Sequence, residues 1–214
     1  MGRIEMILEI TNSSIQLVVL GFLVIWAARQ TREAWLFRLI IGAFGCYFLG
    51  SLFWELYLLV RTDWPQGFSV SELAFYGFYC FFIAIALKLR EKWTDGQWAE
   101  ANKHKMAALF GPLVVIAFHT VYFLLWGELV IDILSGVILS LLFYHTLLGY
   151  FAGGGYKRYH CMVLIVFTLE LLVLLTGIFV DYGDPYSISY NIFSYIQMAA
   201  WFFIIPAARK GADV

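Results

Sequence analysis

The sequence predicts an all-α integral membrane protein, a bundle of seven transmembrane helices with the N-terminus outside and the C-terminus in the cytoplasm. Of its 214 residues, 62% are hydrophobic and only 14% are charged, whereas about 25% are charged in an ordinary soluble domain. The mean hydropathy is +0.80. Seven apolar runs, each close to the roughly 20 residues that a helix needs to cross a bilayer, predict the number of spans.

Each apolar run lies between charged or turn-rich segments and predicts one helix. The expected spans cover about residues 7–28, 35–60, 69–89, 106–126, 129–151, 160–181 and 187–208. The polar stretch of residues 90–105 is the longest break between them. Because the spans use most of the chain, we expect a single membrane domain over residues 1–214 and no soluble domain.

Positive charge is concentrated on one side of this topology. Of the 14 Lys and Arg residues, only Arg3 and Arg61 lie on the side of the N-terminus. The other twelve lie at or beside the breaks after spans one, three and five, or in the C-terminal tail. Since Lys and Arg are retained in the cytoplasm, that side is expected to be cytoplasmic. The expected location is a bacterial inner membrane, which the chain crosses several times.

Several classes of function are disfavoured by the sequence. A net charge of −1 leaves no basic surface for nucleic acid. The last span holds no lysine that could form a retinal Schiff base, and no motif of a hydrolase, a metalloprotease or a phosphate loop is present. His119 and His145 fall at different depths, which disfavours a haem between them. We therefore expect no cofactor, no metal and no enzymatic activity.

Ionisable side chains inside spans are costly to insert, by about 2.5–3.5 kcal/mol each, and they indicate candidate functional sites. Several of them and two aromatic residues fall in the outer half of the spans: Glu55, Glu72, Tyr76, His119, Tyr122 and Asp132. Together they predict an acidic, aromatic ligand pocket open to the outside. Such a pocket would suit a cation, or would respond to external pH. The plainer interpretation, in which these residues cap helices or pair at the boundary, stays open.

Glu170 lies near the middle of the sixth span. Asp181 shares its helix face, because an interval of eleven residues places two side chains within about 20° of each other. The seventh span carries a polar stripe at intervals of three and four, formed by Ser187, Asn191, Ser194 and Gln197. We expect the two faces to meet inside the bundle, with Glu170 either neutral or hydrogen-bonded by Asn191, Ser194 or Gln197. Glu170, Asn191 and Gln197 thus form a candidate switch or proton site.

A stretch from the second to the third span carries a resemblance to a known family. It contains Trp54-Glu55, Arg61, Trp64-Pro65, Ser69-Val70-Ser71-Glu72-Leu73 and Tyr76, and it resembles bacterial seven-span sensor modules that precede diguanylate cyclase or histidine kinase domains. The resemblance implies a ligand sensor in which Glu72 opens the third span and Glu55 is its outer neighbour. Only a short tail, from about residue 207 to residue 214, follows the seventh span. Either a separate partner supplies the output, or the resemblance concerns the scaffold alone.

The first functional hypothesis is a stand-alone, receptor-like sensor in the lipid bilayer. It would relay an extracytoplasmic signal, namely a cation, a pH change or a small molecule, to a cytoplasmic signalling partner. The alternative is a small proton- or cation-coupled transporter that uses Glu170. A third reading is an accessory membrane subunit without its own activity. The oligomeric state does not follow from the sequence.

Overall fold

The structure is a computed structural model that describes residues 3–31, 33–61, 69–126, 129–180 and 188–212, and within these ranges the chain forms helices and no β-strand. The long helices are α1 (Arg3–Ala28), α2 (Ala34–Val60), α3 (Val70–Arg90), α6 (Phe110–Trp126), α7 (Leu129–Ala152), α8 (Lys157–Val180) and α9 (Ile188–Trp201). The short helices are α4 (Asp95–Lys103), α5 (Lys105–Ala108) and α10 (Ile204–Ala212). Seven helical segments of the described chain are long and apolar enough to cross a membrane. The prediction of an all-α, multi-pass bundle is confirmed to this extent.

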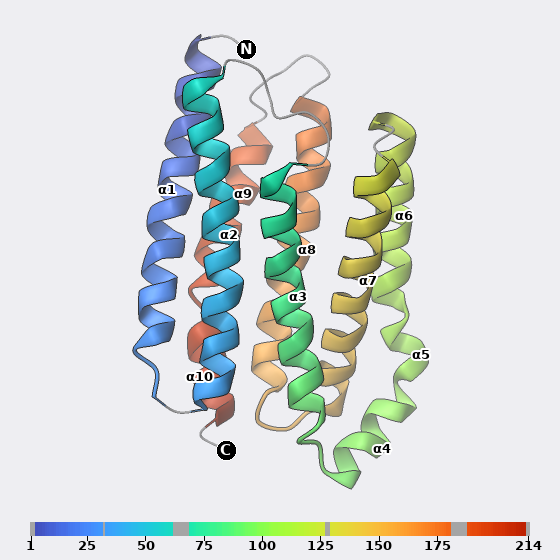
Figure 1. Cartoon of the computed structure of the whole chain (residues 1–214). Helices are drawn as coiled ribbons and strands as arrows, with labels where there is room; N and C mark the ends of the chain where they lie inside the picture. Colours follow the sequence, from blue (N-terminus) through green and yellow to red (C-terminus); the bar gives the residue numbers. More distant parts are fainter. Residues whose placement is uncertain (1–2, 32, 62–68, 127–128, 181–187, 213–214) are drawn as a thin grey trace.

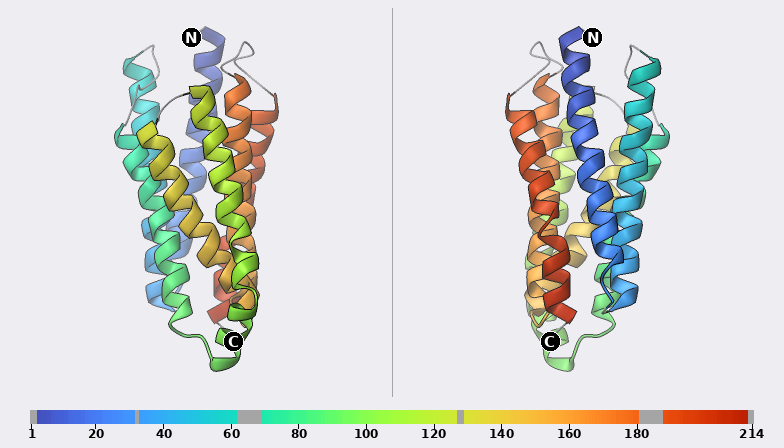
Figure 2. Two further views of the ribbon diagram at one scale, coloured as in Figure 1. Left: turned by 90° about the vertical axis from the view of Figure 1, so that its right-hand side faces the viewer. Right: turned by 90° about the vertical axis from the view of Figure 1, so that its left-hand side faces the viewer.

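The long helices run up and down the bundle, and the two termini lie at opposite ends (Figure 1). Six spans form a closed ring, in which α1 packs on α2, α2 on α3, α3 on α7, α7 on α8 and α8 on α9, while α9 returns to α1. Helix α6 lies outside this ring and packs mainly against α7, as the left view of Figure 2 shows. One span is therefore held mainly by one long neighbour.

Aromatic side chains fill the centre of the ring. The ring of Phe78 on α3 lies 5.1 Å from that of Phe82 and 5.5 Å from that of Phe167 on α8. The ring of Tyr47 on α2 lies 5.1 Å from that of Trp201 on α9. Tilted and edge-to-face contacts of this kind each add about 0.5–1.5 kcal/mol beyond the burial of their area. They join α2, α3, α8 and α9 into one packed core.

The polar stretch of residues 90–105, which the sequence predicts as a simple break, contains helix α4. A capping box begins this helix, because the Thr94 and Gln97 side chains each bond the other's backbone N–H group. The Gln97 side chain also donates to the backbone carbonyl of Gly153, at 3.4 Å, and the His104 ring stacks 4.8 Å from that of Phe151. Helix α4 is thus attached beneath the end of α7.

The last span, predicted as one helix over residues 187–208, is interrupted. Helix α9 ends at Trp201 and α10 begins at Ile204. Pro206 has no backbone N–H with which to continue the helical ladder. The amides of Phe202 and Phe203 bond three residues back, to Ala199 and Ala200, at 3.3 and 3.0 Å. This tighter turn offsets α10 from the axis of α9.

Candidate functional site

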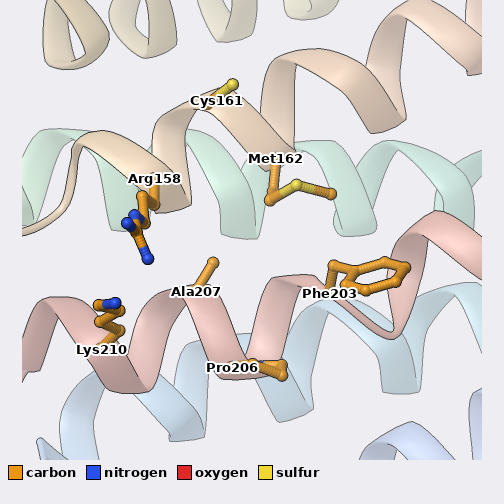
Figure 3. A pocket seen from close by; sticks show the side chains of 7 residues that line it. All are labelled: Arg158, Cys161, Met162, Phe203, Pro206, Ala207 and Lys210. Carbon is orange, nitrogen blue, oxygen red and sulfur yellow. The ribbon is translucent and has the colours of Figure 1, made fainter.

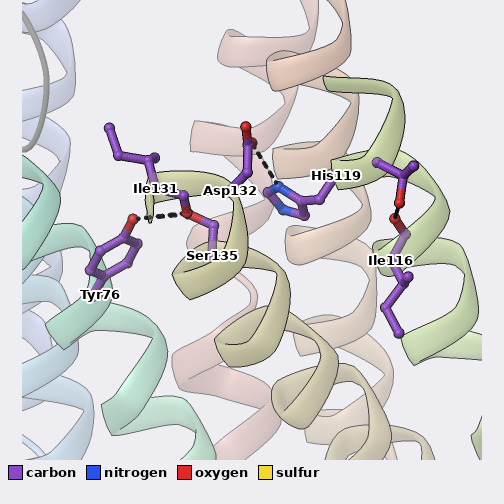
Figure 4. Close-up of polar contacts among 7 residues, drawn as sticks. Tyr76, Ile116, His119, Ile131, Asp132 and Ser135 are labelled. Atoms are coloured by element: carbon purple, nitrogen blue, oxygen red, sulfur yellow. Dashed lines mark hydrogen bonds and ion pairs between the residues drawn. The ribbon is translucent and has the colours of Figure 1, made fainter. Parts of the chain in front are cut away.

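The contacts of the predicted outer set fall in three pairs of helices: α1 with α2, α3 with α7, and α6 with α7. Glu55 on α2 accepts a hydrogen bond of 2.7 Å from Ser14 on α1. The Tyr76 hydroxyl on α3 contacts Ser135 Oγ at 3.1 Å and donates to the Ile131 carbonyl at 3.3 Å, both on α7 (Figure 4). His119 on α6 contacts Asp132 on α7. The set is thus spread over α2, α3, α6 and α7.

Glu72 and Tyr122, the other two members of this set, lie one turn from these contacts. Glu72 is half-buried on α3, on the same face as Tyr76, and its carboxyl is close enough to act electrostatically on the Tyr76 hydroxyl. The carboxyl of Asp132 acts on the same hydroxyl. Tyr122 is half-buried on α6, with its ring 6.2 Å from that of Phe118. Both carboxyl groups therefore act on the Tyr76 hydroxyl, one from α3 and one from α7.

The contact between His119 and Asp132 is almost sealed from solvent. The Nδ1 and Oδ1 atoms are 3.4 Å apart, and the side chains are only 9% and 5% exposed. In a neutral ring, Nδ1–H donates to the carboxylate and Nε2 is left as an acceptor. No hydrogen-bond partner of Nε2 occurs in the described part of the chain. A buried acceptor without a partner is unfavourable by about 1–3 kcal/mol, and a ligand donor would satisfy it.

A groove of about 280 Å³ runs beside this pair, between α6 and α7. His119 and Asp132 supply polar groups to it, and its remaining lining is mostly apolar: Ile116, Thr120, Phe123, Leu129, Ile133, Gly136 and Val137. Ile116 and Ile133 are more than half exposed, so the groove opens at the periphery of the bundle, where lipid would lie. Its shape and lining suit a small molecule with an apolar body and one polar group.

Glu170 forms a second polar cluster in the core of the bundle. The side chain is 7% exposed. Its Oε1 accepts a hydrogen bond of 3.0 Å from the hydroxyl of Tyr79 on α3, and its Oε2 accepts one from the amide of Gln197 on α9. One carboxyl group on α8 is therefore bonded from two other helices. Such an arrangement locks the relative positions of three spans.

The sequence predicts only part of this central cluster. Gln197 is one of its expected partners, whereas Asn191 is half-buried on the same helix and makes no bond to Glu170. Asp181 and Ser187, expected on the same faces, lie outside the described residues. Tyr79 was not predicted, because nothing in the local pattern of α3 distinguishes it from the aromatic residues around it. Only the packing of α3 on α8 shows its role.

Buried polar contacts also join α1 to α2. Ser51 on α2 donates to the side-chain oxygen of Gln16 on α1, at 3.0 Å. The Gln16 side chain lies beside the Tyr47 hydroxyl, and that hydroxyl is within electrostatic range of Glu170. Hydrogen bonds thus join α1 and α2 beside the aromatic core of which Tyr47 is part.

No family model, curated protein or solved structure matches the chain. The fold defines the class of the molecule, a helical bundle with seven candidate membrane spans. Within the described residues, no group of three or more His, Cys, Asp or Glu side chains could hold a metal ion. The α6–α7 groove and the Glu170 cluster are therefore the features of the molecule that bear on its function.

Proposed function

We propose that the protein is a membrane sensor whose ligand enters the α6–α7 groove and binds at His119 and Asp132. The observation that carries this proposal is the buried Nε2 acceptor of His119, which has no partner in the described chain and belongs to a side chain that lines the groove. The ligand donates a hydrogen bond to Nε2 and carries an apolar body. An ammonium group fits best, because the Asp132 carboxylate is adjacent.

The attachment of α6 supports a route for the signal. Helix α6 packs mainly on α7 and continues through α5 into α4. A ligand that separates α6 from α7 would therefore pull α4 away from the end of α7, to which Gln97 and His104 attach it. Helix α4 is polar and lies at the far end of the bundle (Figure 1). The Glu170 lock holds α3, α8 and α9 as a fixed frame during this movement. A cytoplasmic partner recognises the change in the position of α4.

The proposed topology puts the groove in the outer half of a bacterial inner membrane, with the N-terminus outside. The support is the charge distribution: twelve of the 14 Lys and Arg residues lie at or beside the segments that follow α1, α3 and α7, or in α10. Positive residues mark the cytoplasmic side. His119 lies nearer to the opposite end of α6, so the ligand comes from the outer leaflet or from outside the cell.

Hexylammonium tests the proposal, with hexanol as the uncharged comparison. In nanodiscs, hexylammonium is expected to raise the Tm of the wild-type protein and to change the rate of amide exchange in α4. Hexanol is expected to have a smaller effect on both. Asp132→Asn and His119→Leu should each weaken binding by at least about tenfold. His145→Leu, a histidine of α7 that does not line the groove, is the control. Equal binding by Asp132→Asn and by the wild type would refute the site.

A proton-coupled carrier is the second candidate, and the depth and burial of Glu170 favour it. The test is proton flux in liposomes, measured with a pH-sensitive dye inside. A carrier loses its flux in Glu170→Gln, which keeps the shape of the side chain and loses its titration. A wild-type protein without flux excludes the carrier. In that case, the sensor proposal expects Glu170→Gln to alter binding of the cytoplasmic partner instead.

A further inference from the structure

A second groove lies between α8 and α10, at the end of the bundle that carries the C-terminus. It has a volume of about 310 Å³, and its lining consists of Arg158, Cys161, Met162, Phe203, Pro206, Ala207 and Lys210. Figure 3 shows the two cationic side chains together at one end and Phe203 and Met162 toward the other. The groove is thus cationic at one end and apolar along its length.

The break in the last span creates this groove. The turn at Phe202 and Phe203 offsets α10 from α9, and Ala207 is too small to fill the space that faces α8. Phe203 is 58% exposed at the edge of the groove, so a large apolar side chain is left with surface that only lipid would cover. The turn itself follows from Pro206.

The two cations lack a carboxylate partner in the described chain. Lys92, by contrast, pairs with Glu33 at 2.9 Å, and Lys103 pairs with Glu100 at 2.8 Å. Among the described residues, neither Arg158 nor Lys210 makes such a pair. Two like charges that share one end of a groove repel each other, and an anion between them would relieve this repulsion.

We propose that this groove binds one anionic phospholipid of the cytoplasmic leaflet. Its phosphate lies between Arg158 and Lys210, and one acyl chain covers Met162, Phe203 and Pro206. The order of the lining, cations at the membrane surface and apolar groups deeper, matches the order of headgroup and acyl chain. Basic pockets between spans on the cytoplasmic side bind anionic headgroups in this way. The inference does not depend on the sensor proposal.

Native mass spectrometry in a neutral detergent tests the lipid site. Phosphatidylglycerol is the probe, phosphatidylcholine the zwitterionic comparison, and glycerol 3-phosphate and inorganic phosphate the soluble comparisons. The wild-type protein is expected to retain one phosphatidylglycerol molecule in preference to phosphatidylcholine. Arg158→Gln with Lys210→Gln should weaken this binding by about tenfold or more. Binding of inorganic phosphate as tight as that of phosphatidylglycerol would overturn the lipid proposal in favour of a phosphate site.

The neighbouring residues in sequence provide a matched control. Lys157→Gln with Arg209→Gln removes the same charge at the same end of the bundle, but neither residue lines the groove, so binding should persist. Equal losses in both double variants would show a general charge effect and overturn the site. Phe203→Ala keeps both cations and should still weaken binding, because the acyl contact is lost. Since Phe203 is exposed, this variant leaves the core intact.

Discussion

The hydrogen bond from Tyr79 to Glu170 ties α3 to α8. Tyr79→Phe removes the hydroxyl but keeps the ring, whose centroid lies 5.7 Å from that of Phe167. One oxygen of a buried carboxyl group then loses its donor, and the free energy of unfolding should fall by about 1–3 kcal/mol. Denaturant titration of the purified protein measures this loss. Tyr195→Phe, an exposed tyrosine of α9, should change stability little, and equal effects of the two changes would argue against the lock.

Two glycines of α7 should respond to alanine in opposite directions. At Gly136 an added Cβ would lie 3.6 Å from the His119 side chain, an ordinary contact. At Gly149 it would run into the ring of His160, which is only 2% exposed and has no room to move. Gly136→Ala should therefore raise stability by up to about 1 kcal/mol through helix propensity. Gly149→Ala should lower it by about 1–3 kcal/mol through overpacking. Thermal unfolding compares them, and the reverse order would contradict the packing of α7 on α8.

At the scale of single residues, the sequence identifies the unusual side chains but does not predict which of them contact one another. Glu170 and Gln197 are recognisable from their depth and helical spacing, and the structure joins them. Tyr79 looks like any other aromatic residue of its span. His119 and Asp132 lie thirteen residues apart on different helices, and their contact depends on the rotation of α6 against α7. Hydropathy does not determine that rotation.

Among the elements, α4 shows how a polar segment can form a helix without an apolar face. Thr94→Ala removes the side chain that caps its first turn, which should weaken the helix by about 1 kcal/mol. Amide exchange over Asp95–Lys103 should then become roughly fivefold faster. Asn102→Ala, an exposed residue of the same helix, is the control. Unchanged exchange in Thr94→Ala would mean that contacts with α7, rather than the cap, hold α4 in place.

At the end of the bundle that carries α4, an ion pair between Glu33 and Lys92 joins the connection after α1 to the connection after α3. Hydrogen bonds from Lys92, opposed by a smaller effect of burial, hold the pKa of the Glu33 carboxyl below its ordinary value of 4.5. The folded state thus favours the deprotonated form. The stabilisation is complete above pH 4.5 and is lost as the pH falls through the lowered pKa.

Lys92→Met tests this pair, because it keeps an apolar stem over the ring of Trp35. At pH 7 it should lower the free energy of unfolding by about 0.5 kcal/mol, the usual size for a partly exposed pair. The difference from the wild-type protein should vanish well below pH 4.5. Lys88→Met should have a smaller effect, because the partner of Lys88 is Glu91, which is exposed and only three residues away. A difference that persists in acid would point to lost packing instead of lost charge.

For the whole molecule, hydropathy and length were sufficient to predict an all-α bundle with seven candidate spans. Apolar runs of this length must satisfy their backbone polar groups internally, and a helix does so within one segment. Two features were missed for physical reasons. Helix α4 is too polar to register as a span, although Thr94 and Gln97 have the spacing of a capping box. The break before α10 follows from Pro206, which leaves the hydropathy of the run almost unchanged.

The orientation of the bundle decides how the two grooves are reached. Reporter fusions after Val214 and within residues 95–102 should be active in the cytoplasm, and a tag at residue 2 should be accessible from outside. The reason is that twelve of the 14 Lys and Arg residues lie on one side. With this orientation, the His119 groove faces the outer leaflet and the Arg158–Lys210 groove faces the cytoplasmic leaflet. An N-terminus in the cytoplasm would exchange these positions. The ligand of α6 and α7 would then come from inside the cell, and the two cations would face the outer leaflet, where the charge argument for the lipid no longer holds.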